Sequence, residues 1–256
     1  MIAVLSFFVL GKMAINTCFD DSTRYFYEPI IILKIIVIVI CVWWAKKANL
    51  FIHFGFLNGI KWVLPLCLCM SGVVLYWVFW DIKEEIEPTK LYQFIILQFL
   101  SGTFEEMMMR GIVFYSLYQY WEHAKNGLKK AMIYASLFFA LAHFIGVILH
   151  GFDISIFNQI VLAFGIGMFL QAIQVRLKNL TIPITIHALF NVWGSYEAKL
   201  VRVRDIDVYT SSDKLFSLIA FSLFVFLILI PLSLLILGKT WSNHQGKVLI
   251  NETYGE

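Results

Sequence analysis

Charged residues are scarce in this chain. Asp, Glu, Lys and Arg make up 14% of its 256 residues, whereas soluble domains carry about 25%. Hydrophobic residues make up 60%, and the mean hydropathy is +0.79. This balance excludes an ordinary soluble domain and predicts an integral membrane protein. The net charge of +3, without a dense basic patch, excludes a nucleic-acid partner.

Several familiar catalytic and metal-binding motifs are also missing. Cys18, Cys41, Cys67 and Cys69 lack the spacing of a zinc or redox site, so we interpret them as packing residues. The chain has no HExxH and no GxSxG sequence, and no Asp lies deep in an apolar run. These absences argue against a helix-borne zinc protease, a nucleophile-elbow hydrolase and a two-aspartate membrane protease.

Long apolar runs dominate the chain, and a membrane-spanning helix needs about 20 mostly apolar residues. On that basis the predicted spans are 2–16, 29–45, 62–80, 91–119, 131–150, 154–175, 180–197 and 215–237. We therefore predict an all-α fold, a polytopic bundle of about eight transmembrane helices that forms one domain, 1–256. Seven spans remain the alternative, because the first run is short and broken at Gly11-Lys12.

The loops and the tail give an orientation. Residues 239–256 form a polar tail. Lys and Arg are slightly more numerous in the loops on the N-terminal side, which predicts that both termini are cytoplasmic. Lys34 interrupts the second span near its start, and we expect its side chain to extend to the nearer membrane surface. The compact chain favours a bacterial plasma membrane.

The fourth span contains three charged residues, Glu105, Glu106 and Arg110. Each charged side chain costs about 2.5–3.5 kcal/mol at the bilayer centre, so these positions call for an explanation. Glu106 and Arg110 are four residues apart, in the favourable order for a helical ion pair, and we predict that they form a structural pair. Glu105 is displaced by about 100° around the helix and has no partner within it. Desolvation of such a carboxylate suits a general base, so Glu105 is the candidate catalytic residue.

Two further spans carry histidines at depth. Phe139 and His143 are one helical turn apart, and so are His187 and Asn191. A single His in an apolar helix is usually a hydrogen-bonded core residue. Two such residues, on different helices, in a chain that also buries a Glu predict a polar site inside the bundle.

These residues, in this order, resemble the CPBP family of intramembrane proteases, which includes the type II CaaX prenyl endopeptidases and the bacterial Abi proteins of bacteriocin processing and immunity. The family pattern EExxxR, FxxxH and HxxxN matches Glu105-Glu106 with Arg110, Phe139 with His143, and His187 with Asn191. The resemblance covers a catalytic core at 91–197. Met109 stands where many members have an aromatic residue, and the usual Pro before the double Glu is absent, which bears on substrate preference.

The resemblance implies an intramembrane endopeptidase that acts on a peptide or small membrane-associated protein, such as a leader peptide. Glu105 and His143 would activate a water, while His187 and Asn191 would hydrogen-bond the oxyanion; Glu106 and Arg110 would support the site. No cofactor is required on this interpretation. Zinc held by Glu105, His143 and His187 is the alternative, because these are zinc-ligand types. We expect membrane lipid to surround the helices. The sequence does not predict an oligomeric state.

Two alternative functions belong to other classes. A bacteriocin self-immunity factor or scaffold would keep the polar residues for helix packing alone. A transporter would use Glu and His as a proton relay. The chain has no internal repeat or pair of broken helices to support transport.

Overall fold

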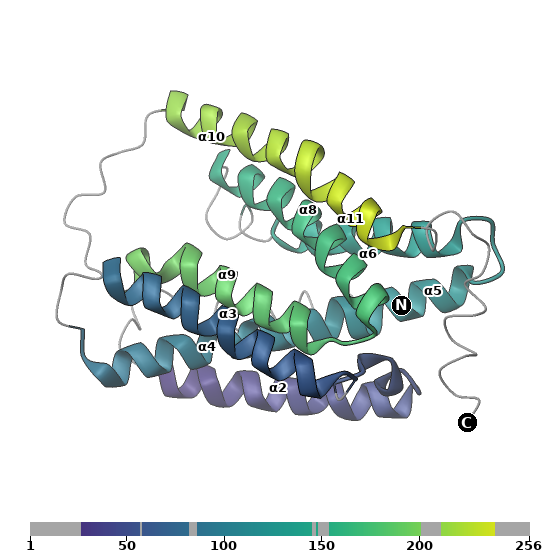
Figure 1. The fold of residues 1–256 in the computed structure, drawn as a ribbon, viewed down its shortest axis with the longest axis horizontal. Coiled ribbons are helices and arrows are strands. Elements are labelled where there is room, and N and C mark those ends of the chain that lie inside the picture. Colours follow the sequence, from purple (N-terminus) through teal and green to yellow (C-terminus); the bar gives the residue numbers. More distant parts are fainter. Residues whose placement is uncertain are drawn as a thin grey trace. The chain divides into compact units, whose positions relative to one another are not determined.

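A computed structural model describes residues 27–56, 58–81, 86–144, 147, 154–200 and 211–238. All the regular structure in these ranges is helical, so the predicted all-α class is confirmed. The chain divides into two compact units. One contains α2, α3, α4 and α9, and the other contains α5, α6, α8, α10 and α11 (Figure 1). The prediction of one transmembrane domain is not tested by this division.

In the first unit, helix α4 (Pro88–Glu106) packs against α2 (Tyr27–Lys47) and α9 (Thr181–Leu200), and α3 (Ile60–Asp81) packs against α9. Pro88 opens α4 at a position where a missing N–H costs nothing. Helix α2 is rich in Ile and Val and ends in Lys46 and Lys47, the basic charge that suits a helix C-terminus.

A polar clamp fixes the beginning of α9. The Asn179 side chain accepts hydrogen bonds from the backbone N–H groups of Thr181, at 2.7 Å, and Ile182, at 3.3 Å. It also donates to the carbonyl of Asn58 at 2.6 Å, and Leu180 N–H donates to the Phe54 carbonyl at 2.9 Å. Asn179 therefore caps α9 and ties it to the loop before α3.

In the second unit, α8 (Ile154–Leu177) packs against α6 (Gly127–Ala142), α10 (Ser211–Phe224) and α11 (Ile230–Leu237), and α5 (Phe114–Trp121) packs against α6. A π-helical turn, η4 (Val225–Leu229), joins α10 to α11. Another, η3 (Met107–Val113), joins α4 to α5, so the chain is helical from Pro88 to Trp121.

Most predicted spans coincide with these helices to within a few residues at each end, and the largest break within a span comes after α6. Within the predicted span 131–150, α6 ends at Ala142, and beyond Phe144 only Val147 lies among the described residues. His143 and Phe144 donate their N–H groups to the carbonyls of Ala140 and Leu141, at 3.0 and 2.9 Å, which are the three-residue bonds of a tightening last turn. The first predicted span, 2–16, and the tail, 239–256, lie outside the described residues.

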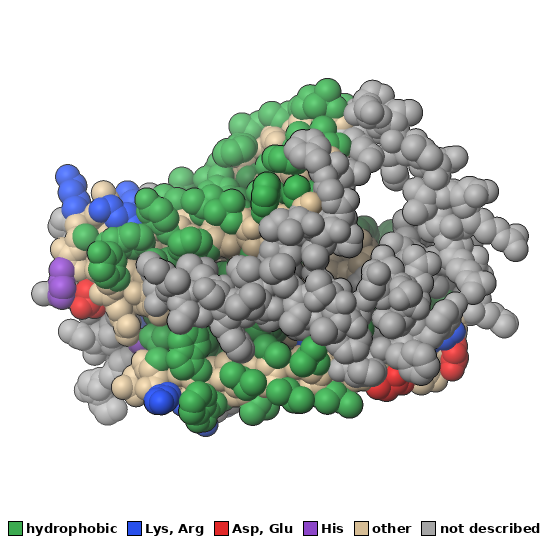
Figure 2. All heavy atoms as spheres, turned by 180° about the vertical axis from the view of Figure 1, so that it is seen from behind, with side chains coloured by type: hydrophobic (Ala, Val, Ile, Leu, Met, Phe, Trp, Pro, Cys, Tyr) green, Lys and Arg blue, Asp and Glu red, His purple; other side chains and the backbone are tan. Residues whose placement is uncertain are grey.

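Membrane character is visible on the described surface. Among the described residues, three helical stretches are long and apolar enough to span a bilayer, at Ile60–Trp80, Ile156–Leu177 and Leu215–Leu237. The count of eight spans is not confirmed. Large apolar side chains face outward on these helices, among them Leu68, Trp80, Phe216 and Leu235. In Figure 2 hydrophobic side chains cover much of the described surface, as lipid-facing helices require.

Candidate active site

Glu105 and Glu106 form the last residues of α4, where the α-helix gives way to the π-helical turn η3. Such turns are rare and are found frequently at functional sites. The two carboxylates differ in access: the Glu106 side chain is 0% exposed, whereas that of Glu105 is 14% exposed. A partly exposed carboxylate can contact a water or a substrate, whereas a fully buried carboxylate cannot.

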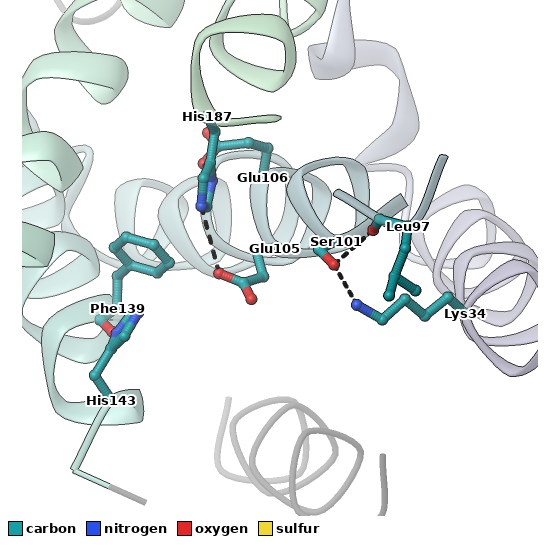
Figure 3. A network of polar contacts seen from close by, with 8 residues as sticks. All are labelled: Lys34, Leu97, Ser101, Glu105, Glu106, Phe139, His143 and His187. Atoms are coloured by element: carbon teal, nitrogen blue, oxygen red, sulfur yellow. Dashed lines mark hydrogen bonds and ion pairs between the residues drawn. The ribbon is translucent and has the colours of Figure 1, made fainter. Parts of the chain in front are cut away.

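His187 on α9 lies against both glutamates. Its Nδ1 is 2.6 Å from Oε1 of Glu106, and its Nε2 is 3.7 Å from Oε2 of Glu105. The first distance is that of a short hydrogen bond with a carboxylate, and the second is too long for one. Figure 3 shows the imidazole directed from α9 towards the Glu105 carboxylate. The structure thus brings three of the predicted site residues together.

This geometry constrains the proton positions on His187. An ionised carboxylate only accepts hydrogen bonds, so the bond to Glu106 places a proton on Nδ1. The neutral imidazole then carries its lone pair on Nε2, on the side of Glu105. His187 can donate from Nε2 only as the imidazolium, because the single N–H of the neutral ring lies on Nδ1.

Asn191 lies on α9 one turn after His187 and is half-buried. The Ser195 hydroxyl donates to its backbone carbonyl at 2.5 Å. The position on the His187 side of α9 agrees with the predicted spacing. The use of its amide as an oxyanion donor stays a prediction.

Arg110, Phe139 and His143 belong to the other unit, where Phe139 contacts both of the other side chains. The Arg110 guanidinium carbon lies 4.5 Å from the centre of the Phe139 ring, and the His143 ring meets Phe139 edge-on at 5.1 Å. Arg110 is 1% exposed, so its contact with the ring is a desolvated cation–π interaction. Phe139, which the sequence offered only as a motif position, therefore links Arg110 to His143.

His143 lies at the C-cap of α6, half-buried, with Nδ1 3.0 Å from the Phe139 carbonyl. A carbonyl only accepts, so Nδ1 carries the proton and Nε2 the lone pair, as on a neutral His187. The predicted joint action of Glu105 and His143 draws on residues of both units and stays a prediction. The predicted Glu106–Arg110 pair crosses the same division and stays a prediction as well.

Lys34 makes a contact that the sequence analysis did not predict. Its ammonium donates to the Ser101 hydroxyl, and Ser101 in turn donates to the Leu97 carbonyl at 2.7 Å (Figure 3). Ser101 lies one turn before Glu105 on α4. The signal in the sequence was a polar Ser at helical spacing from the glutamates, with a Lys in a neighbouring span.

A zinc site is supported only in part by the described residues. Glu105 and His187 are zinc-ligand types, and a carboxylate on the other ring nitrogen, as Glu106 provides, commonly orients a metal-binding His. Within the described ranges, however, no three His, Cys, Asp or Glu side chains gather as a metal site. We therefore derive no step through a metal.

Comparison with known families supplies the class of this site. Residues 87–193 match the family described as Type II CAAX prenyl endopeptidase Rce1-like. This segment is a Rce1-like protease domain. It begins just before α4 and includes every candidate site residue from Glu105 to Asn191, which confirms the resemblance seen in the motifs. No curated protein and no solved structure matches the chain closely enough to compare.

The family that residues 87–193 match is a family of proteases, and the long apolar helices support a membrane location. The buried Glu–His contacts are consistent with peptide hydrolysis. The family match does not identify the substrate.

Proposed function

We propose that this protein is an intramembrane endopeptidase that hydrolyses a peptide bond in a peptide or small membrane-associated protein of a bacterial-type plasma membrane. One observation carries the proposal. Of two adjacent carboxylates, Glu106 is sealed and hydrogen-bonded to His187, while Glu105 keeps partial exposure and faces the other ring nitrogen. A purely structural cluster has no need for this division.

Glu105 acts as the general base in this proposal. It takes a proton from a water, whose oxygen attacks the peptide carbonyl, and the proton then passes to the leaving amine. His143, with its lone pair on Nε2, helps to hold the water. Because the Glu105 side chain is only partly buried, water can reach it without a separation of α4 from α9.

His187 and Asn191 stabilise the oxyanion of the tetrahedral intermediate. With Nδ1 bonded to Glu106, His187 donates from Nε2 as the imidazolium, which is a stronger donor than a neutral ring. Asn191 adds a neutral amide donor one turn away. Glu106 therefore supports the site through His187, in addition to any pairing with Arg110.

The deciding experiment compares purified wild-type protein with Glu105→Gln. Each is incubated with candidate membrane peptides in liposomes, and the products are identified by mass spectrometry. Cleavage is expected from the wild type alone, because the amide keeps the size of the side chain but cannot accept a proton. Normal turnover by folded Glu105→Gln would remove the proposed mechanism. Full biological activity without any cleavage would establish the immunity or scaffold function instead.

A further inference from the structure

Helices α4 and α9 lie close together at a glycine. A Cβ atom added to Gly102 would lie 3.1 Å from the backbone nitrogen of Ala188 and 3.3 Å from its Cα and Cβ. Ordinary van der Waals contact begins at about 3.4 Å, so even a methyl group would force the two backbones apart. Gly102 is buried and Ala188 is 0% exposed, so solvent or lipid offers no room.

The conformation of Gly102 does not explain its presence. The glycines with positive φ among the described residues are Gly55, Gly59 and Gly238. Gly102 lies inside α4 with ordinary helical geometry, where alanine would favour the helix. What this position requires is therefore the absence of a side chain.

This contact between α4 and α9 lies next to the residues of the proposed site. Ala188 directly follows His187, and Gly102 precedes Glu106 by one turn of α4. The bond from Nδ1 of His187 to Oε1 of Glu106, at 2.6 Å, spans the same two helices. A separation of a few tenths of an ångström at Gly102 would lengthen this short bond towards the roughly 2.9–3.0 Å of an ordinary N–H···O hydrogen bond and so weaken it.

We propose that Gly102 is a positioning residue for the hydrolysis: its missing side chain lets α9 approach α4 to the separation at which Glu106 hydrogen-bonds Nδ1 of His187 and so fixes the direction of Nε2. This inference rests on the proposed function for its kinetic part only. The helix separation and the His187–Glu106 bond can be measured without a substrate.

The kinetic test uses Gly102→Ala and Gly102→Val with an internally quenched peptide that spans the cleavage site found by mass spectrometry. We expect kcat to fall by roughly 10-fold for Ala and 10²-fold for Val, with little change in KM. A misplacement of about 1 Å costs about 10²-fold, and the smaller alanine side chain moves α9 by less. Gly194→Ala is the matched control on α9, since its Cβ would meet nothing within 4 Å. Adding Ala188→Gly to Gly102→Ala removes one of the three contacts and should restore part of kcat.

The structural test observes the proton on Nδ1 of His187 by NMR of ¹⁵N-histidine-labelled protein in micelles, with the signal assigned by its loss in His187→Gln. A hydrogen bond to a carboxylate moves this proton downfield, and we expect the shift to shrink in Gly102→Ala and to persist in Gly194→Ala. An unchanged signal in folded Gly102→Ala, whatever happens to thermal stability, would overturn the inference and make Gly102 a packing residue. If Gly102→Val does not fold, the alanine variant alone decides. If the wild type cleaves nothing, the proposed function fails, while this measurement still tests the helix separation.

Discussion

Glu105 and Glu106 are neighbours in the chain, but their side chains have different surroundings. Helical spacing predicted that they point in different directions, and the structure adds the residue that connects them, His187. The sequence could not supply this contact, because it depends on how closely α9 approaches α4. It also could not predict Lys34 bonded to Ser101, since hydropathy favours extension to the surface and does not reveal a hydroxyl on another helix.

Glu106→Gln should lower kcat as well as stability. The amide oxygen can still accept from Nδ1 of His187, but it carries no charge to stabilise the imidazolium. By analogy with the orienting acid of a catalytic triad, we expect a loss of at least about 10²-fold in kcat. Removing one member of a buried charge pair also costs about 3–5 kcal/mol of stability. Glu106→Asp, which keeps the charge, should recover part of the stability; equal kcat in Gln and wild type would contradict this role.

Asn191→Ala should lower kcat by roughly 10²–10³-fold with little change in KM, because an oxyanion donor acts mainly in the transition state. His187→Ala should behave similarly. The double variant should lose less than the product of the single losses, since both groups act on one oxygen. Steady-state kinetics and thermal stability should be measured on the same preparations. If the residues only bridge helices, stability would change by about 0.6 kcal/mol each and cleavage would not follow them.

At the scale of elements, hydropathy predicted where the helices lie but not how they end. Each predicted span that the structure describes contains a helix over most of its described residues, because a membrane leaves a backbone few alternatives. The early end of α6 and the π-helical turns η3 and η4 depend on local hydrogen bonds that a period of 3.6 residues does not encode. Consequently the sequence placed His143 inside a helix, while the structure places it at the cap.

The three methionines of η3 illustrate the same limit. Met107, Met108 and Met109 are apolar residues that could either face lipid or pack inside the protein, and their exposed fractions of 1%, 0% and 1% show that they pack. Hydropathy treats a lipid-facing and a buried methionine alike, so only packing could decide.

Met108→Ala should therefore destabilise the protein by about 2–5 kcal/mol, the usual cost of a cavity left by a large apolar side chain. The Met108 sulfur lies 3.3 Å from the Cys41 thiol of α2, so the variant also loses a contact between helices. The measurement is thermal unfolding in detergent. Leu68→Ala is the matched control, because Leu68 is 64% exposed on α3 and should tolerate truncation in an apolar environment. Equal losses in the two variants would contradict the packing of η3.

At the scale of the whole molecule, the motif residues are divided between the two compact units. Glu105, Glu106, His187 and Asn191 belong to one unit, and Arg110, Phe139 and His143 to the other. The order of the motifs along the chain was enough to predict a protease family, which the match over residues 87–193 confirms. The order could not say which residues share a unit, because chain neighbours such as Glu106 and Arg110 fall on opposite sides of the division.

The choice between metal-free and zinc-dependent hydrolysis also concerns the whole molecule, since the alternative ligand set of Glu105, His143 and His187 draws on both units. We predict that protein washed with a strong chelator keeps full peptidase activity and contains far less than one equivalent of metal. The reason is that Glu105 itself can accept the proton of the water, so the mechanism needs no Lewis acid. Metal content is measured by elemental analysis on the same samples as turnover. The Glu105→Gln variant is measured alongside to test whether Glu105 is a metal ligand. Stoichiometric zinc that is lost and regained together with activity, and that Glu105→Gln fails to bind, would instead make these three residues ligands.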